Sequence, residues 1–206
     1  MSRRAIARFL VTTAAFYVLV LLISQVVAAQ AGEHSDDAGA AAAFQAAVPV
    51  LRHPRCMNCH SSGDFPRPGN DSHRHTMRIH RGPGGQGVNA VRCTTCHQDH
   101  NLEGVHMPPG APGWHLPSPT IPMIWEGLTD HQLCEVLKDP QKNGHRTPEQ
   151  IVEHMHTPLV LWAWSPGEGR TPVLMPQNDF LGKIQEWAGK GAACPTEARA
   201  LMAPRH

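Results

Sequence analysis

The chain has few aromatic residues and almost no net charge. Phenylalanine, tryptophan and tyrosine make up 5% of its 206 residues, and the formal net charge at pH 7 is +1. Balanced charge leaves no basic stripe of the kind that binds nucleic acid. No nucleophile–base arrangement and no phosphate-binding loop stands out, so the sequence offers no signature of a site that converts a substrate.

Proline and glycine are abundant instead, with 19 and 18 residues respectively. Both residue types favour turns and loops. The sequence has no strand-rich region and no repeat apart from the two motifs described below, so we expect a mainly α fold with extensive loops. Such a chain buries little apolar side-chain area unless something large fills its centre.

The first 31 residues have the features of an export signal. Three arginines precede an apolar run from Phe9 to about Val27, which ends near the small-x-small sequence Ala29-Gln30-Ala31 that is typical of signal-peptidase cleavage. The run is also long enough, at about 1.5 Å per residue, to remain as a membrane anchor. In either case we expect the rest of the chain to be exported to the periplasm.

Four of the six cysteines lie in two Cys-x-x-Cys-His units. Zinc ribbons also use paired cysteines but need no histidine after each pair, and thioredoxin-like pairs follow a strand in a βαβ unit that is not predicted here. Attachment of c-type haem requires the whole unit, because two thiols one helical turn apart bond the vinyl groups and the next histidine binds the iron. We therefore predict two covalently bound c-type haems, held by Cys56, Cys59, Cys93 and Cys96, with His60 and His97 as proximal iron ligands.

The remaining cysteines are Cys134 and Cys194. In an oxidising compartment a leftover pair most simply forms a disulfide, which here would close a loop of about 60 residues. The alternative is two buried free thiols.

The two motifs begin only 37 residues apart. A separate haem domain of the usual kind needs more chain than that. We therefore predict one compact dihaem cytochrome c-like domain over residues 50–195. A linker with a short helix precedes it at 32–49, and a C-terminal tail follows at 196–206.

Four helices are expected in the exported part. Asp36 and Asp37 can cap a helix over 41–47 that stops at Pro49, and Thr129 can cap one over 130–138. A third helix, over 148–156, follows a capping box and begins with proline. The last runs over 178–190, and its apolar face contains Phe180, Leu181, Ile184, Trp187 and Ala188.

The sequence resembles c-type cytochromes beyond the two motifs. Residues 180–192, Phe-x-x-x-Ile-x-x-Trp-Ala-x-x-Gly-Ala, are similar to the closing helix of many small cytochromes c. Residues 53–60, 110–116 and 159–164 resemble a family of exported dihaem cytochromes labelled as a subunit of isoquinoline 1-oxidoreductase, a molybdenum hydroxylase. The resemblance covers most of residues 50–195. It implies an electron-acceptor partner for a molybdenum-containing dehydrogenase, although the chain itself has no feature for binding a molybdopterin.

Each iron needs a second axial ligand unless its site is open, and 13 of the 15 histidines remain for two positions. His75 lies between the motifs, on the same face of an extended segment as His73 and Met77, and is the expected distal ligand of the first haem. His73 and Met77 are the alternatives. His115, in a proline-rich loop beside Trp114, is expected for the second. The ordinary alternative for each is a solvated or hydrogen-bonded loop histidine.

Methionines provide further alternatives. Met175 precedes the last helix, where small cytochromes c often carry a methionine ligand, and is the alternative distal ligand for one of the haems. Met107 and Met123 are alternatives for the second haem, although core packing is the commoner role of methionine. His154 is expected to contact a haem propionate or the core.

Other residues are expected to surround the haems. The five tryptophans most simply wall the haem pockets. The arginines that flank the motifs can pair with haem propionates or remain solvated; they are Arg52, Arg55, Arg74 and Arg92.

Two haems in one small unit predict an electron-transfer protein that passes single electrons between a dehydrogenase and an acceptor. The alternative is a dihaem peroxidase or a similar oxidoreductase with one open iron site. The chain is short for that class, and its motifs are too close for a two-domain plan. A sensor or assembly role is a third possibility.

Overall fold

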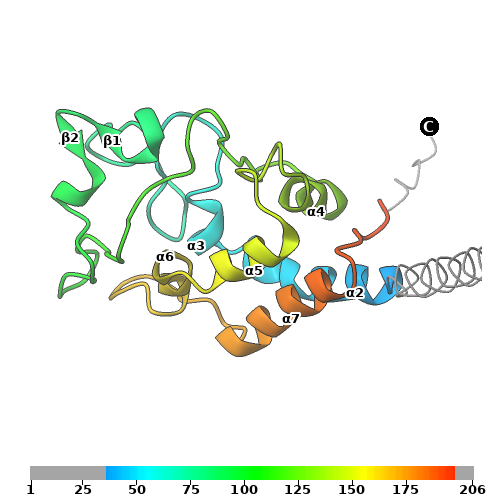
Figure 1. Ribbon diagram of the computed structural model, residues 1–206. Coiled ribbons are helices and arrows are strands. Elements are labelled where there is room, and N and C mark those ends of the chain that lie inside the picture. Colours follow the sequence, from blue (N-terminus) through cyan, green and yellow to red (C-terminus); the bar gives the residue numbers. More distant parts are fainter. Residues whose placement is uncertain (1–35, 198–206) are drawn as a thin grey trace, which may run out of the picture. The chain divides into compact units, whose positions relative to one another are not determined.

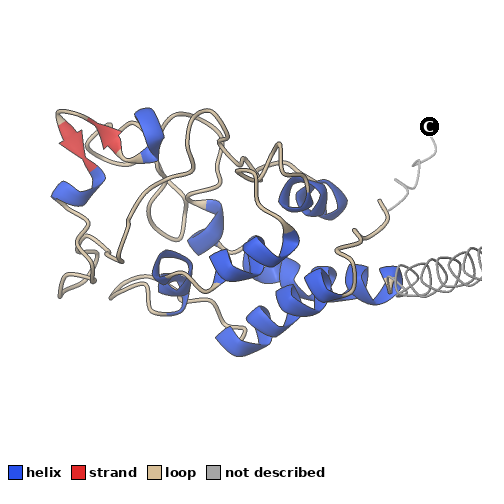
Figure 2. Cartoon of the chain, viewed as in Figure 1, coloured by secondary structure: helices blue, strands red, loops and turns tan. Residues whose placement is uncertain are grey.

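The protein is described from a computed structural model over residues 36–197. The predicted export signal at 1–31 and the end of the tail at 198–206 lie outside this range. The described chain is mainly helical with extensive loops, in agreement with the predicted fold class (Figures 1 and 2). Between residues 36 and 197, no helix is both long and apolar enough to cross a membrane.

The two longest helices pack side by side and form the base of the core (Figure 1). They are α2 (Asp37–Leu51) and α7 (Gln177–Gly189). Phe44 of α2 and Trp187 of α7 are almost fully buried, and their ring centroids are 5.5 Å apart. Helix α5 (Pro148–Met155) packs on α7, and α4 (Asp130–Lys138) contacts α2 and α5.

Local capping explains where these helices begin. The Asp36 carboxylate accepts the Gly39 backbone N–H at 2.8 Å, as expected for the residue preceding a helix. Thr129 and Gln132 form a capping box at the start of α4, and Thr147 and Gln150 form another at α5. The predicted starts of α4 and α5 are therefore confirmed.

The first helix is longer than predicted, because it continues through Pro49 to Leu51. Proline removes one backbone donor from the helix but its fixed φ is compatible with helical geometry. Val50 and Leu51 are buried in the core on the far side of the proline. Their burial offsets the missing hydrogen bond, since a fully buried aliphatic side chain contributes about 1.5–3 kcal/mol.

The predicted disulfide between Cys134 and Cys194 is confirmed. It joins α4 to the segment that follows α7, with the two Cα atoms 5.6 Å apart. The bond spans 60 residues, so it closes a loop that contains α5 and α7.

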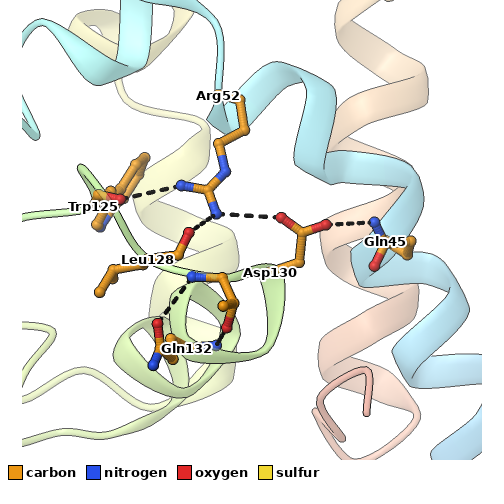
Figure 3. A network of polar contacts seen from close by, with 7 residues as sticks. Gln45, Arg52, Trp125, Leu128, Asp130 and Gln132 are labelled. Carbon is orange, nitrogen blue, oxygen red and sulfur yellow. Dashed lines mark hydrogen bonds and ion pairs between the residues drawn. The ribbon is translucent and has the colours of Figure 1, made fainter. Parts of the chain in front are cut away.

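A polar network fastens the end of α2 to the segment before α4 (Figure 3). Arg52 donates to the carbonyl oxygens of Trp125 at 3.1 Å and Leu128 at 2.6 Å, and it pairs with Asp130 at 3.2 Å. Gln45 donates to the other carboxylate oxygen of Asp130 at 2.7 Å. The network holds the backbone of Trp125, whose ring forms part of the candidate site.

The remaining elements are short and surround open space. Between residues 61 and 123, only Ala111 and Leu116 are buried apolar residues. This part of the chain is therefore not organised around a side-chain core. It contains the strands β1 (Gly87–Val88) and β2 (Val91–Arg92), paired antiparallel, and short turns of helix at Pro83–Gly85 and Cys93–Thr95. Elsewhere there are α3 (Pro54–Met57), α6 (Pro158–Leu161) and a turn at Trp162–Trp164.

Candidate functional site

Both Cys-x-x-Cys-His motifs fold as one helical turn. The His60 backbone N–H donates to the Cys56 carbonyl at 3.2 Å, and the His97 N–H donates to the Cys93 carbonyl at 2.9 Å. The first motif overlaps α3, which begins with Pro54 at a position where proline is favoured. In each motif the two thiols therefore lie one turn apart, as thioether attachment to one planar group requires.

His60 is held in one orientation by two contacts. Its Nδ1 lies 2.9 Å from the Met123 carbonyl, and its ring stacks on Trp125 with centroids 3.6 Å apart and planes 2° from parallel. Burial lowers the pKa of His60 to about 3, so the ring is neutral at pH 7. A neutral imidazole that donates from Nδ1 leaves Nε2 free to bind a metal.

His97 repeats this arrangement with different partners. Its Nδ1 lies 2.7 Å from the Pro109 carbonyl, and its ring is stacked 4.7 Å from Trp114 with planes 3° from parallel. Burial also lowers the pKa of His97. Gly110 allows this approach, since a Cβ there would collide with the carbonyl oxygens of Gln98 and His100.

Two adjacent cavities lie beside the motifs. The first, of about 400 Å³, is lined by Cys56, Cys59 and His60, and the second, of about 750 Å³, by Cys93, Cys96 and His97. Both volumes fall in the range of about 300–1,000 Å³ that is typical of ligand and cofactor sites. The cavities share a wall made of Arg55, Cys59, Trp114, His115 and Trp162.

Four buried side-chain nitrogens of the described residues have no hydrogen-bond partner, and all four belong to cavity walls. Trp125 Nε1 is at the first cavity, Arg67 Nε and His75 Nδ1 are at the second, and Arg55 Nε is at both. Orphaned buried donors are rare in folded proteins. Their concentration here fits a site whose polar contacts are completed by a bound group.

None of the four motif cysteines takes part in a disulfide. Burial raises the pKa of Cys56 to about 12 and that of Cys59 to about 11. Among residues 36–197, no three Cys, His, Asp or Glu side chains gather closely enough to hold a metal ion by themselves, so the four thiols do not converge on one tetrahedral site.

His75 lies beside the second motif, although its position in the sequence predicts it as a ligand of the first haem. Its ring centroid is 6.3 Å from that of His97. The two ring planes are 65° from parallel, and both rings line the second cavity. Nδ1 of His75 is buried and has no hydrogen-bond partner within the described range.

The backbone explains why His75 reaches the second cavity. Asn58, inside the first motif, donates to the Gly69 carbonyl at 2.8 Å and accepts from the Ser72 hydroxyl at 2.7 Å. The His75 N–H then donates to the Pro66 carbonyl at 3.3 Å. The first motif thus anchors the loop that carries a histidine to the other motif.

His154 lines the first cavity together with His60. It lies on α5 between Ile151 and Met155, which are buried. Burial, and then the positive charge of Arg146, lower the pKa of His154 to about 4. Its place on the inner face of an amphipathic helix is a sequence signal that could have ranked it above the loop histidines.

Other candidate ligands are less well placed. His115 lies on the shared wall, but it is exposed and its Nδ1 is 2.5 Å from the Gly113 carbonyl. Met175 packs against the core and lies on the wall of neither cavity. His73 is exposed and pairs with Asp71 at 2.6 Å, and Met77 is 63% exposed.

Two methionines expected as alternatives have other neighbours. Met123 supplies the carbonyl that accepts from His60, and Met107 is 42% exposed and supplies a carbonyl to Arg170. The carbonyls of Met123 and Pro109 have roles that no side-chain pattern signals, so sequence reasoning missed them.

Comparison with known proteins finds no matching family model, no matching curated protein and no matching solved structure. The functional argument therefore depends on the geometry of the two motifs and their cavities.

Proposed function

We propose that the chain is an exported cytochrome that carries two covalent c-type haems and transfers single electrons. The observation that carries the proposal is the twofold repetition of one arrangement. At each motif, a helical turn presents two thiols, a backbone carbonyl fixes Nδ1 of the histidine, a tryptophan stacks on its ring, and a cavity lies alongside.

The residues present fit a haem at each motif. Cys56 and Cys59 would form the thioethers in the first cavity, and Cys93 and Cys96 those in the second. A haem supplies reversible one-electron exchange, with a potential that depends on its axial ligands and surroundings. The unpartnered Nε atoms of Arg55 and Arg67 would supply donors for its polar edge.

The chain's own residues orient and protect the two sites. The carbonyls of Met123 and Pro109 keep the proton of each proximal histidine on Nδ1, so that Nε2 is the free nitrogen. Trp125 and Trp114 prevent each ring from rotating. Because the cavities share a wall, electrons would pass between neighbouring sites within one domain.

We assign His154 as the distal ligand in the first cavity and His75 in the second. Each lies on the wall of the same cavity as one proximal histidine. Bis-histidine ligation leaves no open coordination position, which favours electron transfer over peroxidase chemistry. The assignment moves His75 from the first haem to the second, and it replaces His115 as the first choice and Met175 as the alternative.

Magnetic spectroscopy of the haem-loaded protein tests the assignment. Wild type should be entirely six-coordinate and low-spin, and His75→Ala and His154→Ala should each convert one haem to high spin. The controls are His100→Ala and His156→Ala, which remove exposed histidines that lie on neither cavity wall. A high-spin haem in the wild type, or turnover of hydrogen peroxide, would support the enzyme alternative instead.

The family resemblance adds a proposed partner, a periplasmic molybdenum-containing dehydrogenase. Mixing the purified cytochrome with such an enzyme and its substrate should reduce the haems, as seen in their visible spectrum. If the enzyme is active with an artificial acceptor but does not reduce the haems, it is excluded as the partner. That result would not affect the proposal that the chain carries two haems.

A further inference from the structure

Arg55 is a buried cation that no carboxylate neutralises within residues 36–197. It is 4% exposed, and none of the ion pairs of the described residues includes it. Its Nη2 donates to the Gly69 carbonyl at 2.5 Å and to Asn70 Oδ1 at 3.0 Å, but its buried Nε has no partner. Buried charges are costly unless they are paired, so this side chain is incomplete without an anion.

Arg170 shares this property and the same cavity. It is half-buried, and its hydrogen bonds within residues 36–197 go to the backbone carbonyls of Met107 at 2.7 Å and Pro166 at 3.4 Å. Both arginines line the second cavity. Burial, and then the positive charge of Arg170, lower the pKa of Arg55. Two neighbouring like charges on one wall repel each other unless an anion lies between them.

Another arginine of this cavity, unlike Arg55 and Arg170, is paired with a carboxylate of the protein. Arg67 also lines the second cavity, but its guanidinium lies 3.6 Å from the Glu126 carboxylate. Its charge is therefore balanced by the protein. Arg92 lines this cavity without a carboxylate partner too, but it is exposed and donates to Gln86 at 3.1 Å. Arg55 and Arg170 are the less exposed guanidinium groups of the second cavity that no carboxylate of the described residues pairs with.

We propose that Arg55 and Arg170 form a carboxylate-binding site in the second cavity, which holds a propionate of the haem attached at Cys93 and Cys96. The inference rests on the proposed function, because the haem supplies the carboxylate. Guanidinium groups bind carboxylates through parallel N–H donors, and the free Nε of Arg55 is such a donor.

The arginines then act as positioning residues that set the potential of this haem. Replacing either by glutamine removes a positive charge near the iron and favours the oxidised form. At a fixed applied potential, the ratio of reduced to oxidised haem should fall about tenfold, equal to a shift of about −59 mV for one electron. Lysine at either position keeps the charge and should give a much smaller shift.

A spectroelectrochemical titration of the full-length, haem-loaded protein tests the proposal. Arg55→Gln and Arg170→Gln should lower the potential of the same one of the two haems, and Arg55→Lys and Arg170→Lys should largely restore it. Arg74→Gln is the control, since Arg74 lies over the Phe65 ring at 4.4 Å and on neither cavity wall. If Arg55→Gln does not fold, the more exposed Arg170 decides the result.

Three outcomes would overturn the proposal. Unchanged potentials in both glutamine variants, or shifts at different haems, exclude a shared site. Wild-type potentials that change with added acetate, compared with sodium chloride at equal ionic strength, would show that a free carboxylate occupies the site. A wild-type protein without haem at Cys93 and Cys96 would instead refute the proposed function, so the two failures are distinguishable.

Discussion

Replacing Cys134 and Cys194 together by alanine should lower the free energy of unfolding by about 4 kcal/mol. The disulfide spans 60 residues. In the chain-entropy relation, a loop of this length removes about 14 cal/mol/K from the unfolded chain, which is about 4 kcal/mol at 25 °C. This is a large share of the roughly 5–15 kcal/mol by which small domains are stable.

Unfolding of the haem-loaded protein in guanidinium measures this loss of free energy. The unfolding is followed by far-ultraviolet circular dichroism and by the haem absorption band. With a slope of about 4 kcal/mol per molar guanidinium, the midpoint should fall by about 1 M. The haem band should follow the same transition, because the closed loop contains α5 and therefore His154.

Wild type with its disulfide reduced provides the matched control when the double variant is measured in the same reductant, so that the irons have the same oxidation state and only the disulfide is opened. It should unfold at the midpoint of the double variant. A loss below about 1 kcal/mol with an unchanged slope would refute the reasoning, because it would mean that the loop is already restricted in the unfolded state.

Three further changes test other contacts. Trp125→Leu removes a residue that is 3% exposed and stacked on the proximal histidine of the first motif, and should cost about 3 kcal/mol in guanidinium unfolding. Arg52→Gln removes charged hydrogen bonds to two carbonyls and should cost about 2 kcal/mol in the same assay. Hydrogen bonds from Lys183 and then Lys190 lower the pKa of Glu186 to about 2 from 4.5. The ionised Glu186 carboxylate therefore stabilises the fold fully above pH 4.5, and this stabilisation is lost as the pH falls toward 2. Between these pH values, the melting temperature of Glu186→Gln should depend less on pH than that of wild type. Equal dependence in the two proteins would contradict this.

Much of the helical framework could be predicted from local sequence. Capping boxes at Thr129 and Thr147 and the apolar face around Trp187 are short-range signals, and the helices follow them closely. The end of α2 was predicted wrongly because Pro49 is a local signal, whereas the burial of Leu51 that carries the helix past it is a tertiary effect.

The candidate site also combines features that local sequence predicts with features that depend on tertiary structure. The thiols and the two motif histidines follow from spacing alone, since each motif is a single helical turn. The choice of distal histidine does not, because it depends on which loop reaches which cavity. His75 faces the second motif only because Asn58 anchors its loop, and His154 arrives from a helix more than 90 residues after the first motif. The carbonyls that orient His60 and His97 belong to backbone geometry that side-chain patterns do not encode.

The central claim is that both motifs carry covalent haem, and the intact mass of the exported protein tests it most directly. Protein made in a host with a functioning haem-attachment pathway should have the mass of the processed chain plus two haems. Cys56→Ala/Cys59→Ala should retain one haem, and Cys134→Ala/Cys194→Ala should retain both. A processed chain of unmodified mass from that host would contradict the account.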